Sequence, residues 1–542
     1  MTSVTGAPMA PGLLDRQATV AKPGFNRWLV PPAALAIHLC IGMAYGFSVF
    51  WLPMSKMLSH TDAAACRSLG FFDMLVTRSC NWTVPMVTPT FEIFIAMLGI
   101  SAALFGGWLE HAGPRKAGFI AALCWGGGLI IGGIGVMVHQ LWLLWLGAGF
   151  IGGVGQGLGY ISPVSTLIKW FPDRRGMATG MAIMGYGGGA LIGAPIAVAL
   201  MHRFSPYGAT ESVGWTLMAM GVLYFLSMSA GAFGFRVAPT GWRPEGWTHP
   251  APAAKSMITH KDVHLNEAWK TPQFWLIWAV LCLNVTAGIG VIAMASPMMQ
   301  DIFGAKLIGA AGDAAAQKTQ IVAAAAGLVG LISLFNSLGR FFWASVSDYI
   351  GRKTTYAVFF IFGMALYYAL PILGHHGQAG LFVAAVCVIL TMYGGGFSTV
   401  PAYLADLFGT QMVGAIHGRI LTAWSVAGIV GPSLIAELRQ KQIDAGVAHD
   451  LIYDGTLHIL VGMLLVGLIC NLLIFPVADK HHMTDAELQR ERSLQREDVI
   501  KGDARHAAHG RFGPLGLLPW ATVGIPFLIG VYIALGKASA LF

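Results

Sequence analysis

The amino-acid sequence predicts an all-α membrane protein built from two six-helix halves, with one further transmembrane helix at the C-terminal end. Hydrophobic residues make up 56% of the 542 residues and charged residues only 11%, against roughly 25% charged in an ordinary soluble chain. Apolar segments near the ~20 residues needed to cross a bilayer recur along the chain, and one turn motif occurs in both halves. The 70 glycines suit closely packed membrane helices. This composition argues against a soluble multidomain enzyme.

The apolar segments fall into two groups of six, each segment long enough for one membrane-spanning helix. In the first group they begin near Trp28, Met86, Ala117, Gln140, Met177 and Gly214. In the second group they begin near Phe274, Gln320, Thr354, Ala379, Val413 and Leu457. The first segment is too long for the apolar core of a signal peptide, so we expect an uncleaved first helix.

The polar segments between these groups define the expected domain boundaries. The longest internal one, Arg236 to Lys270, contains four prolines and is typical of a linker. A charged segment, Lys480 to Arg511, precedes a last apolar stretch from Pro514 to Leu541. Three prolines interrupt that stretch, so a re-entrant or interfacial segment is the alternative to an additional transmembrane helix. The expected divisions are an N-terminal tail (1–27), a first half (28–236), a linker (237–270), a second half (271–478), a charged segment (479–513) and the additional helix (514–542).

Loop charges predict the orientation, because cytoplasmic loops are enriched in Lys and Arg. Alternate loops and the linker carry the basic residues, including Arg115, Lys116, Lys169, Arg174, Arg175, Arg352 and Lys353. The opposite loops at 139–140 and 375–378 contain neither Lys nor Arg. We therefore expect a multi-pass protein of a bacterial inner membrane with the linker in the cytoplasm. The net charge of +8 follows from this bias and does not indicate a nucleic-acid partner.

Two of the seven cysteines, Cys66 and Cys80, share the polar loop after the first span, and the other five lie in apolar runs. If this loop faces an oxidising periplasm, the two thiols could form a disulfide. Two free thiols are the alternative.

A turn motif follows the second helix of each half. Each copy joins an acidic residue at a helix end to a glycine turn and a basic pair, a spacing that lets carboxylate and cations hold neighbouring helix ends together. The acidic, glycine and basic positions are Glu110, Gly113 and Arg115 in the first copy and Asp348, Gly351 and Arg352 in the second. The recurrence predicts a duplicated six-helix unit and a role for these residues in conformational gating.

This duplication around a central linker resembles the major facilitator superfamily, and further motifs resemble its oxalate/formate antiporter family. The motifs are Gly159-Tyr160-Ile-Ser-Pro163, Lys169-Trp-Phe-Pro172, Met184-Gly-Tyr186, Asn336-Ser-Leu-Gly-Arg340 and Gly414-Ala-Ile-His-Gly-Arg419. The resemblance implies two halves that rock about a site near the bilayer midplane. It further implies transport of small carboxylate anions by alternating access.

Arg340 is the strongest candidate for binding an anion. It precedes Asp348 by eight residues, which places it about 12 Å along a helix from the membrane surface, against a half-thickness of about 15 Å. A guanidinium at this depth is costly unless it meets an anion. Asn336 lies one turn earlier on the same face, and a guanidinium fork with an amide suits a carboxylate. In the resembling family the matching arginine binds the substrate; an arginine satisfied by helix carbonyls is the alternative.

Aromatic residues complete the predicted substrate site. Tyr160, Tyr186, Tyr393 and Phe397 match cavity positions of the resembling family, with simple packing as the alternative. Trp424 stands where oxalate carriers of that family show a lysine, so a second cation is missing. One fixed cation balances a monocarboxylate such as lactate or formate better than oxalate, and oxalate/formate exchange is the alternative.

His38, midway through the first span, could bind a coupling proton, and His417 could add charge when protonated. A packing histidine is the alternative for His38. The expected partners are a small carboxylate, a counter-anion or proton, and the lipid bilayer. We expect a monomer with no nucleic acid, cofactor, metal site or catalytic residues. A membrane-embedded enzyme or a channel is less well supported, because the sequence contains neither a metal-ligand pair nor a convincing nucleophile and base.

Overall fold

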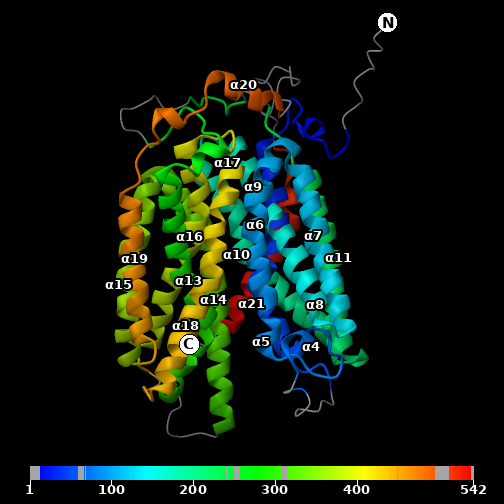
Figure 1. The fold of residues 1–542 in the computed structure, drawn as a ribbon, viewed down its shortest axis with the longest axis vertical. Helices are drawn as coiled ribbons and strands as arrows, with labels where there is room; N and C mark the ends of the chain where they lie inside the picture. The colour runs from blue at the N-terminus through cyan, green and yellow to red at the C-terminus, as the bar shows by residue number, and fades with distance from the viewer. Residues whose placement is uncertain are drawn as a thin grey trace.

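Long α-helices run side by side along the long axis of the computed structural model (Figure 1). The structure describes residues 12–58, 66, 69–239, 242–248, 257–307, 314–448, 450–494 and 512–538. These residues contain helices and two isolated β-bridges but no strand. Twelve of their helical segments are long and apolar enough to cross a membrane. Together with α14, a helix of 37 residues, they confirm the predicted all-α membrane fold.

The first half contains six spans, several of which are composed of consecutive helical pieces. They are η2 (Arg27–Leu29), α1 (Val30–Ile41), η3 (Gly42–Phe50) and α2 (Trp51–Met54); α5 (Val84–Val87) and α6 (Pro89–Ala112); α7 (Pro114–Met137); α8 (Leu141–Leu144), η4 (Trp145–Ile151) and α9 (Gly152–Trp170); α10 (Arg175–Phe204); and α11 (Ala209–Gly234).

The second half repeats this plan after a short helix in the linker, α12 (Leu265–Ala268). Its six spans are α13 (Pro272–Leu307), α14 (Ala314–Ile350), α15 (Arg352–His375), α16 (Ala379–Phe408), α17 (Val413–Ile420) with α18 (Thr422–Asp444), and α19 (Asp454–Leu472). The polar helix α20 (Asp485–Leu494) and the apolar helix α21 (Leu517–Ala538) follow. Helix α21 is the additional C-terminal helix that the sequence predicts.

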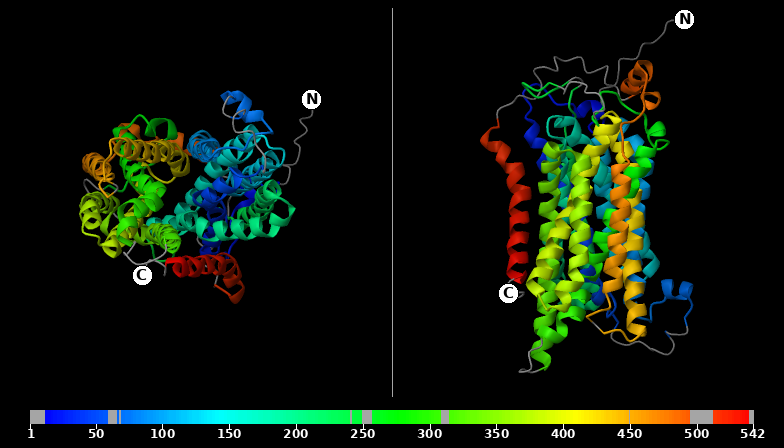
Figure 2. Two further views of the ribbon diagram at one scale, coloured as in Figure 1. Left: turned by 90° about the horizontal axis from the view of Figure 1, so that it is seen from below. Right: turned by 90° about the vertical axis from the view of Figure 1, so that its left-hand side faces the viewer.

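The two halves form two clusters of helices when the bundle is viewed along its axis (Figure 2). They meet along two seams, α10 against α14 and α6 against α17 and α18. Glycine permits the close approach: a Cβ on Gly180 of α10 would lie 2.7 Å from the carbonyl oxygen of Arg340 on α14. The seams are therefore held by backbone packing, as is usual between membrane helices.

The two ends of the bundle differ. We call the end that carries the linker, α12 and α20 the linker face, and the opposite end, which carries α4 (Phe71–Val76), the disulfide face (Figure 1). At the linker face, two backbone hydrogen bonds tie the N-terminal segment to the first half. The amide of Ala21 donates to the carbonyl oxygen of Val237 at 3.0 Å, and the amide of Val237 donates to the carbonyl oxygen of Thr19 at 2.9 Å.

On the disulfide face, Cys66 and Cys80 are bonded to each other. Cys80 is buried, and His139 Nε2 donates to its carbonyl oxygen at 2.8 Å. The ring of His139 stacks on Trp82 with centroids 4.6 Å apart. Burial lowers the pKa of His139 and thereby favours its neutral form, and the hydrogen bond and ring stack keep the loop attached to the bundle.

Replacing both Cys66 and Cys80 by serine should destabilise this loop. The bond joins residues 14 apart in sequence, and closing a loop of this size contributes about 3 kcal/mol in the chain-entropy model. We expect a lower melting temperature of the purified protein, whereas Cys124→Ser, at an unbonded cysteine, should leave it unchanged. Alkylation of both thiols in unreduced, folded protein would contradict this assignment.

Candidate functional site

Arg340 lies on α14 between the two halves and is fully buried. Glycines of two neighbouring helices leave room for its side chain. A Cβ on Gly187 of α10 would lie 2.9 Å from Arg340 Nε, and a Cβ on Gly394 of α16 would lie 3.0 Å from its Cγ. Glycine-rich stretches of α10 and α16 therefore form the walls around the guanidinium.

The guanidinium of Arg340 is only partly satisfied. Its Nε donates to Asn336 Oδ1 at 3.1 Å, and its Nη2 donates to the hydroxyl of Tyr45 at 3.4 Å. Its Nη1 is buried without a hydrogen-bond partner, and no Asp or Glu of the described residues forms an ion pair with it. A buried cation without a counter-charge is costly, and an open N–H beside it is suited to an anionic oxygen.

Aromatic rings surround this cation. Its Cζ lies 5.0 Å from the ring centroid of Phe397 and 5.8 Å from that of Tyr186. Trp424 packs against both rings, with centroids 4.7 Å from Phe397 and 5.1 Å from Tyr186. Tyr393 completes the wall, because its hydroxyl shares a 3.0 Å hydrogen bond with that of Tyr45. The structure thus brings all the predicted substrate-site residues into one cluster.

Two neutral donors in this cluster are also unpaired. The hydroxyl of Tyr160 and the indole Nε1 of Trp424 are buried without hydrogen-bond partners, and their rings lie 5.5 Å apart. The hydroxyl of Tyr186, in contrast, donates to Gln156 Oε1 at 3.1 Å. Because buried polar groups are normally paired, the open N–H of Arg340 and these two donors are suited to a hydrogen-bond acceptor. Tyr186 contributes its ring to the cluster, and its hydroxyl is already paired.

His38 lies next to this cluster and contacts two backbone carbonyls. Its Nδ1 is 2.7 Å from the carbonyl oxygen of Ala182, and its Nε2 is 3.2 Å from that of Tyr160. A neutral imidazole can donate to only one of them, whereas an imidazolium can donate to both. The ring of His417 lies 5.8 Å from that of Tyr160, so both histidines border the site, and proton coupling stays a prediction.

Tyr45 and Gln156 were missed by the sequence analysis. Tyr45 is the half-buried residue of the site, and it follows His38 by seven residues, two helical turns on one face. That spacing was an available signal. Gln156 gave none, because a single amide in a glycine-rich helix is more often a packing residue.

At the linker face the second turn motif joins the two halves. The carboxylate of Asp348 accepts hydrogen bonds from the amides of Gly176 at 2.9 Å and Met177 at 2.8 Å, both on α10. Asp406 of α16 pairs with Arg175 Nη1 at 3.0 Å and with Arg352 Nε at 3.2 Å. The glycine of each motif has a positive φ, +88° at Gly113 and +85° at Gly351, as such a turn requires. These contacts close the α10–α14 seam on this side.

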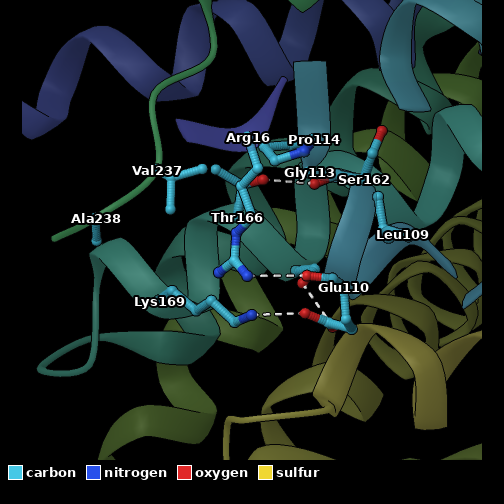
Figure 3. Close-up of a pocket in the computed structure, with 11 residues that line it drawn as sticks. Arg16, Leu109, Glu110, Gly113, Pro114, Ser162, Thr166, Lys169, Val237 and Ala238 are labelled. Carbon is cyan, nitrogen blue, oxygen red and sulfur yellow. Dashed lines mark hydrogen bonds and ion pairs between the residues drawn. The ribbon is translucent and has the colours of Figure 1, made fainter. Parts of the chain in front are cut away.

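The first motif closes the other seam. Glu110 Oε1 accepts from the amide of Gly414 in the second half at 3.0 Å, and Glu110 Oε2 pairs with Lys169 at 2.6 Å. Arg16 also reaches this point and donates to the carbonyl oxygen of Glu110 at 3.0 Å (Figure 3). Arg115 instead donates to the carbonyl oxygen of Leu13 at 2.9 Å, so it anchors the N-terminal segment. The basic partner of the first motif is therefore supplied by Lys169.

Replacing Asp406 by asparagine should weaken this closure. It would leave Arg175, whose side chain is 9% exposed, without its counter-charge, while Arg352 would keep its pair with Asp348; losing one partner of a buried pair costs about 3–5 kcal/mol. We expect faster hydrogen exchange of the amides of Gly176 and Met177. The matched control is Asp479→Asn. Asp479 pairs with Lys261, but their side chains are 87% and 61% exposed, so this pair should contribute little to stability. Equal exchange in the two variants would contradict the assignment.

Comparison with known proteins adds sequence and fold relationships. A profile of the Major Facilitator Superfamily matches residues 34–432. The oxalate:formate antiporter of Oxalobacter formigenes is 27% identical over 415 residues, covering 76% of this chain and 85% of that protein. Apicoplast pyruvate carrier 1 of Toxoplasma gondii is 26% identical over 400 residues, covering 65% of this chain and 69% of that protein. Among solved structures, the proton:xylose symporter XylE aligns with a TM-score of 0.53 at 11% identity, covering 88% of this chain and 99% of that one. At this identity the structural likeness concerns the fold alone.

Proposed function

The chain belongs to the Major Facilitator Superfamily, and we propose that it carries small carboxylate anions across a membrane by alternating access. The observation that carries this proposal is the fully buried Arg340, which has an open N–H and no acidic partner among the described residues. The relatives named above act on oxalate and formate or on pyruvate, all of which are small carboxylates. Members of this superfamily are transporters and not enzymes, so the site needs no catalytic group.

We favour a monocarboxylate such as lactate or formate as the substrate. Arg340 is the one Lys or Arg among the described residues of the cluster, so it balances one negative charge. One carboxylate oxygen can accept from Arg340 Nη1, and the neutral donors Tyr160 and Trp424 can serve the remaining lone pairs. Phe397 offers an apolar surface to a short carbon chain. Oxalate/formate exchange is the second candidate, supported by the name of the bacterial relative.

In the proposed cycle, the bound anion neutralises Arg340 and lowers the cost of moving this buried charge between states. A ligand shifts an equilibrium only by its differential affinity for the two states. The anion must therefore bind differently when the contacts of Asp348, Asp406 and Glu110 open. Because the linker face carries the basic loops, we place it in the cytoplasm. We propose a bacterial inner membrane as the location, supported by the bacterial source of the oxalate:formate antiporter.

A proteoliposome panel tests this proposal. Purified protein would be reconstituted and offered labelled formate, lactate, pyruvate and oxalate, with and without internal counter-substrate and with an imposed pH gradient. We expect saturable uptake of at least one monocarboxylate. Stimulation by internal anion would indicate exchange, and stimulation by an inward proton gradient would indicate symport. Absence of uptake for every acid, or single-channel currents in planar bilayers, would overturn the proposal.

A further inference from the structure

Helix α21 lies outside the twelve spans of the two halves, yet it contacts both. Figure 2 shows it in red along the side of the bundle, where it packs against α10 and α14. Near the linker face, Trp520 Nε1 donates to the carbonyl oxygen of Trp28 in the first half at 3.0 Å. Further along, Leu191 of α10 and Leu334 of α14 form one apolar cluster with Ala534. The helix therefore covers the α10–α14 seam.

Phe527 of α21 occupies a notch in this seam. A Cβ placed on Gly188 of α10 would overlap the Phe527 ring and would lie 3.1 Å from Ser337 Oγ of α14. Ser337 Oγ in turn donates to the carbonyl oxygen of Met184 at 3.0 Å. The ring thus packs at the point where the two halves touch, in space that only a glycine leaves open.

The same notch borders Arg340 on its other side. Gly187 precedes Gly188, and a Cβ on Gly187 would lie 2.9 Å from Arg340 Nε and 3.1 Å from the Cα of Ser337. The same turn of α10 therefore contacts the guanidinium at Gly187 and the Phe527 ring at Gly188. Removing the ring would leave a void behind that turn, and neighbouring backbone relaxes only partly into such a void.

We infer that Phe527 is a positioning residue for the substrate site: it fixes the Gly187–Gly188 turn and Ser337, and through them the geometry of Arg340. This inference rests on the proposed carboxylate transport. The open N–H of Arg340 must be held in a fixed place to meet a carboxylate oxygen, and loosening its support weakens binding without removing a contact to the substrate. The additional helix is thereby part of the transport machinery and not only a membrane anchor.

The test compares Phe527→Ala with Phe527→Leu and with Tyr532→Ala, a control on the same helix whose residue is 80% exposed. In proteoliposome uptake we expect Phe527→Ala to raise KM for the monocarboxylate about tenfold with a smaller change in kcat. Phe527→Leu should have a KM within about threefold of that of the unmodified protein. Tyr532→Ala should have the same KM as the unmodified protein. An unchanged KM in Phe527→Ala would overturn the inference, whatever its melting temperature.

A double variant supplies an independent check. Gly188→Ala alone adds a methyl group that overlaps the Phe527 ring, so it should also raise KM. In Gly188→Ala with Phe527→Ala the overlap is gone and the void is partly filled, so KM should lie below that of either single variant. If the increases in KM of the two single variants instead add up in the double variant, the Gly188–Phe527 contact does not support the site. Uptake by the unmodified protein separates the two proposals, because its absence refutes carboxylate transport, whereas normal uptake with unaltered Phe527 variants refutes only the positioning role.

Discussion

Replacing Arg340 by glutamine should abolish carboxylate uptake and leave the protein folded. Glutamine keeps an N–H donor but removes the charge, so a carboxylate entering the site would lose its hydration without gaining a counter-charge. A hydrogen bond to a charged group contributes about 1.5–3 kcal/mol, so losing the one from Nη1 alone corresponds to roughly ten- to a hundredfold weaker binding, at about 1.4 kcal/mol per tenfold, and the loss of the counter-charge adds to it. Uptake of labelled monocarboxylate, normalised to reconstituted protein, measures the effect.

The same substitution should not lower stability. Arg340 is buried without an acidic partner among the described residues, and replacing an uncompensated buried charge by a neutral side chain removes a desolvation cost. We therefore expect the melting temperature of Arg340→Gln without substrate to equal or exceed that of the unmodified protein. Arg419→Gln is the matched control, because Arg419 donates to Leu265 and Asn266 at the linker face and lies outside the Arg340 cluster. Normal uptake by Arg340→Gln would refute the assigned role of Arg340.

The membrane fold was predictable because bilayer thickness fixes the length of an apolar helix and the turn motif marks the repeat. Segment starts were less accurate. Helix α14 begins at Ala314, ahead of the apolar run expected from Gln320, because an alanine-rich polar turn forms helix readily without being strongly apolar. The shared helix face of Arg340 and Asn336 was predictable from helical spacing alone, whereas their mutual 3.1 Å hydrogen bond appears only in the structure.

Contacts between different helices were not predictable in this way. Tyr45 approaches Arg340 from 295 positions away in sequence, and Phe527 reaches the same region from the last helix. No local periodicity encodes where an additional helix packs. Trp424 is the clearest case. The sequence motif indicates only that a second cation is absent at this position of the predicted site, whereas the structure shows a buried indole N–H without a partner against Phe397.

Replacing Trp424 by lysine should change the preferred substrate from a monoanion to a dianion. Trp424 contacts Phe397, the ring that covers Arg340, so an ammonium at this position adds a second cation to the same enclosed site. A monocarboxylate would then leave one charge uncompensated, at a cost of about 3–5 kcal/mol when buried. We expect the ratio of oxalate to lactate uptake to rise at least about tenfold.

Trp424→Phe separates charge from the loss of the indole. It keeps an aromatic wall and removes the open N–H, so it should weaken monocarboxylate binding by about tenfold and leave the ratio of oxalate to lactate uptake unchanged. Trp424→Lys should alter that ratio, because the added cation favours the dianion over the monoanion. Equal ratios in the two variants would show that position 424 contributes shape and not electrostatics, and that the single charge of Arg340 does not set the valence of the substrate.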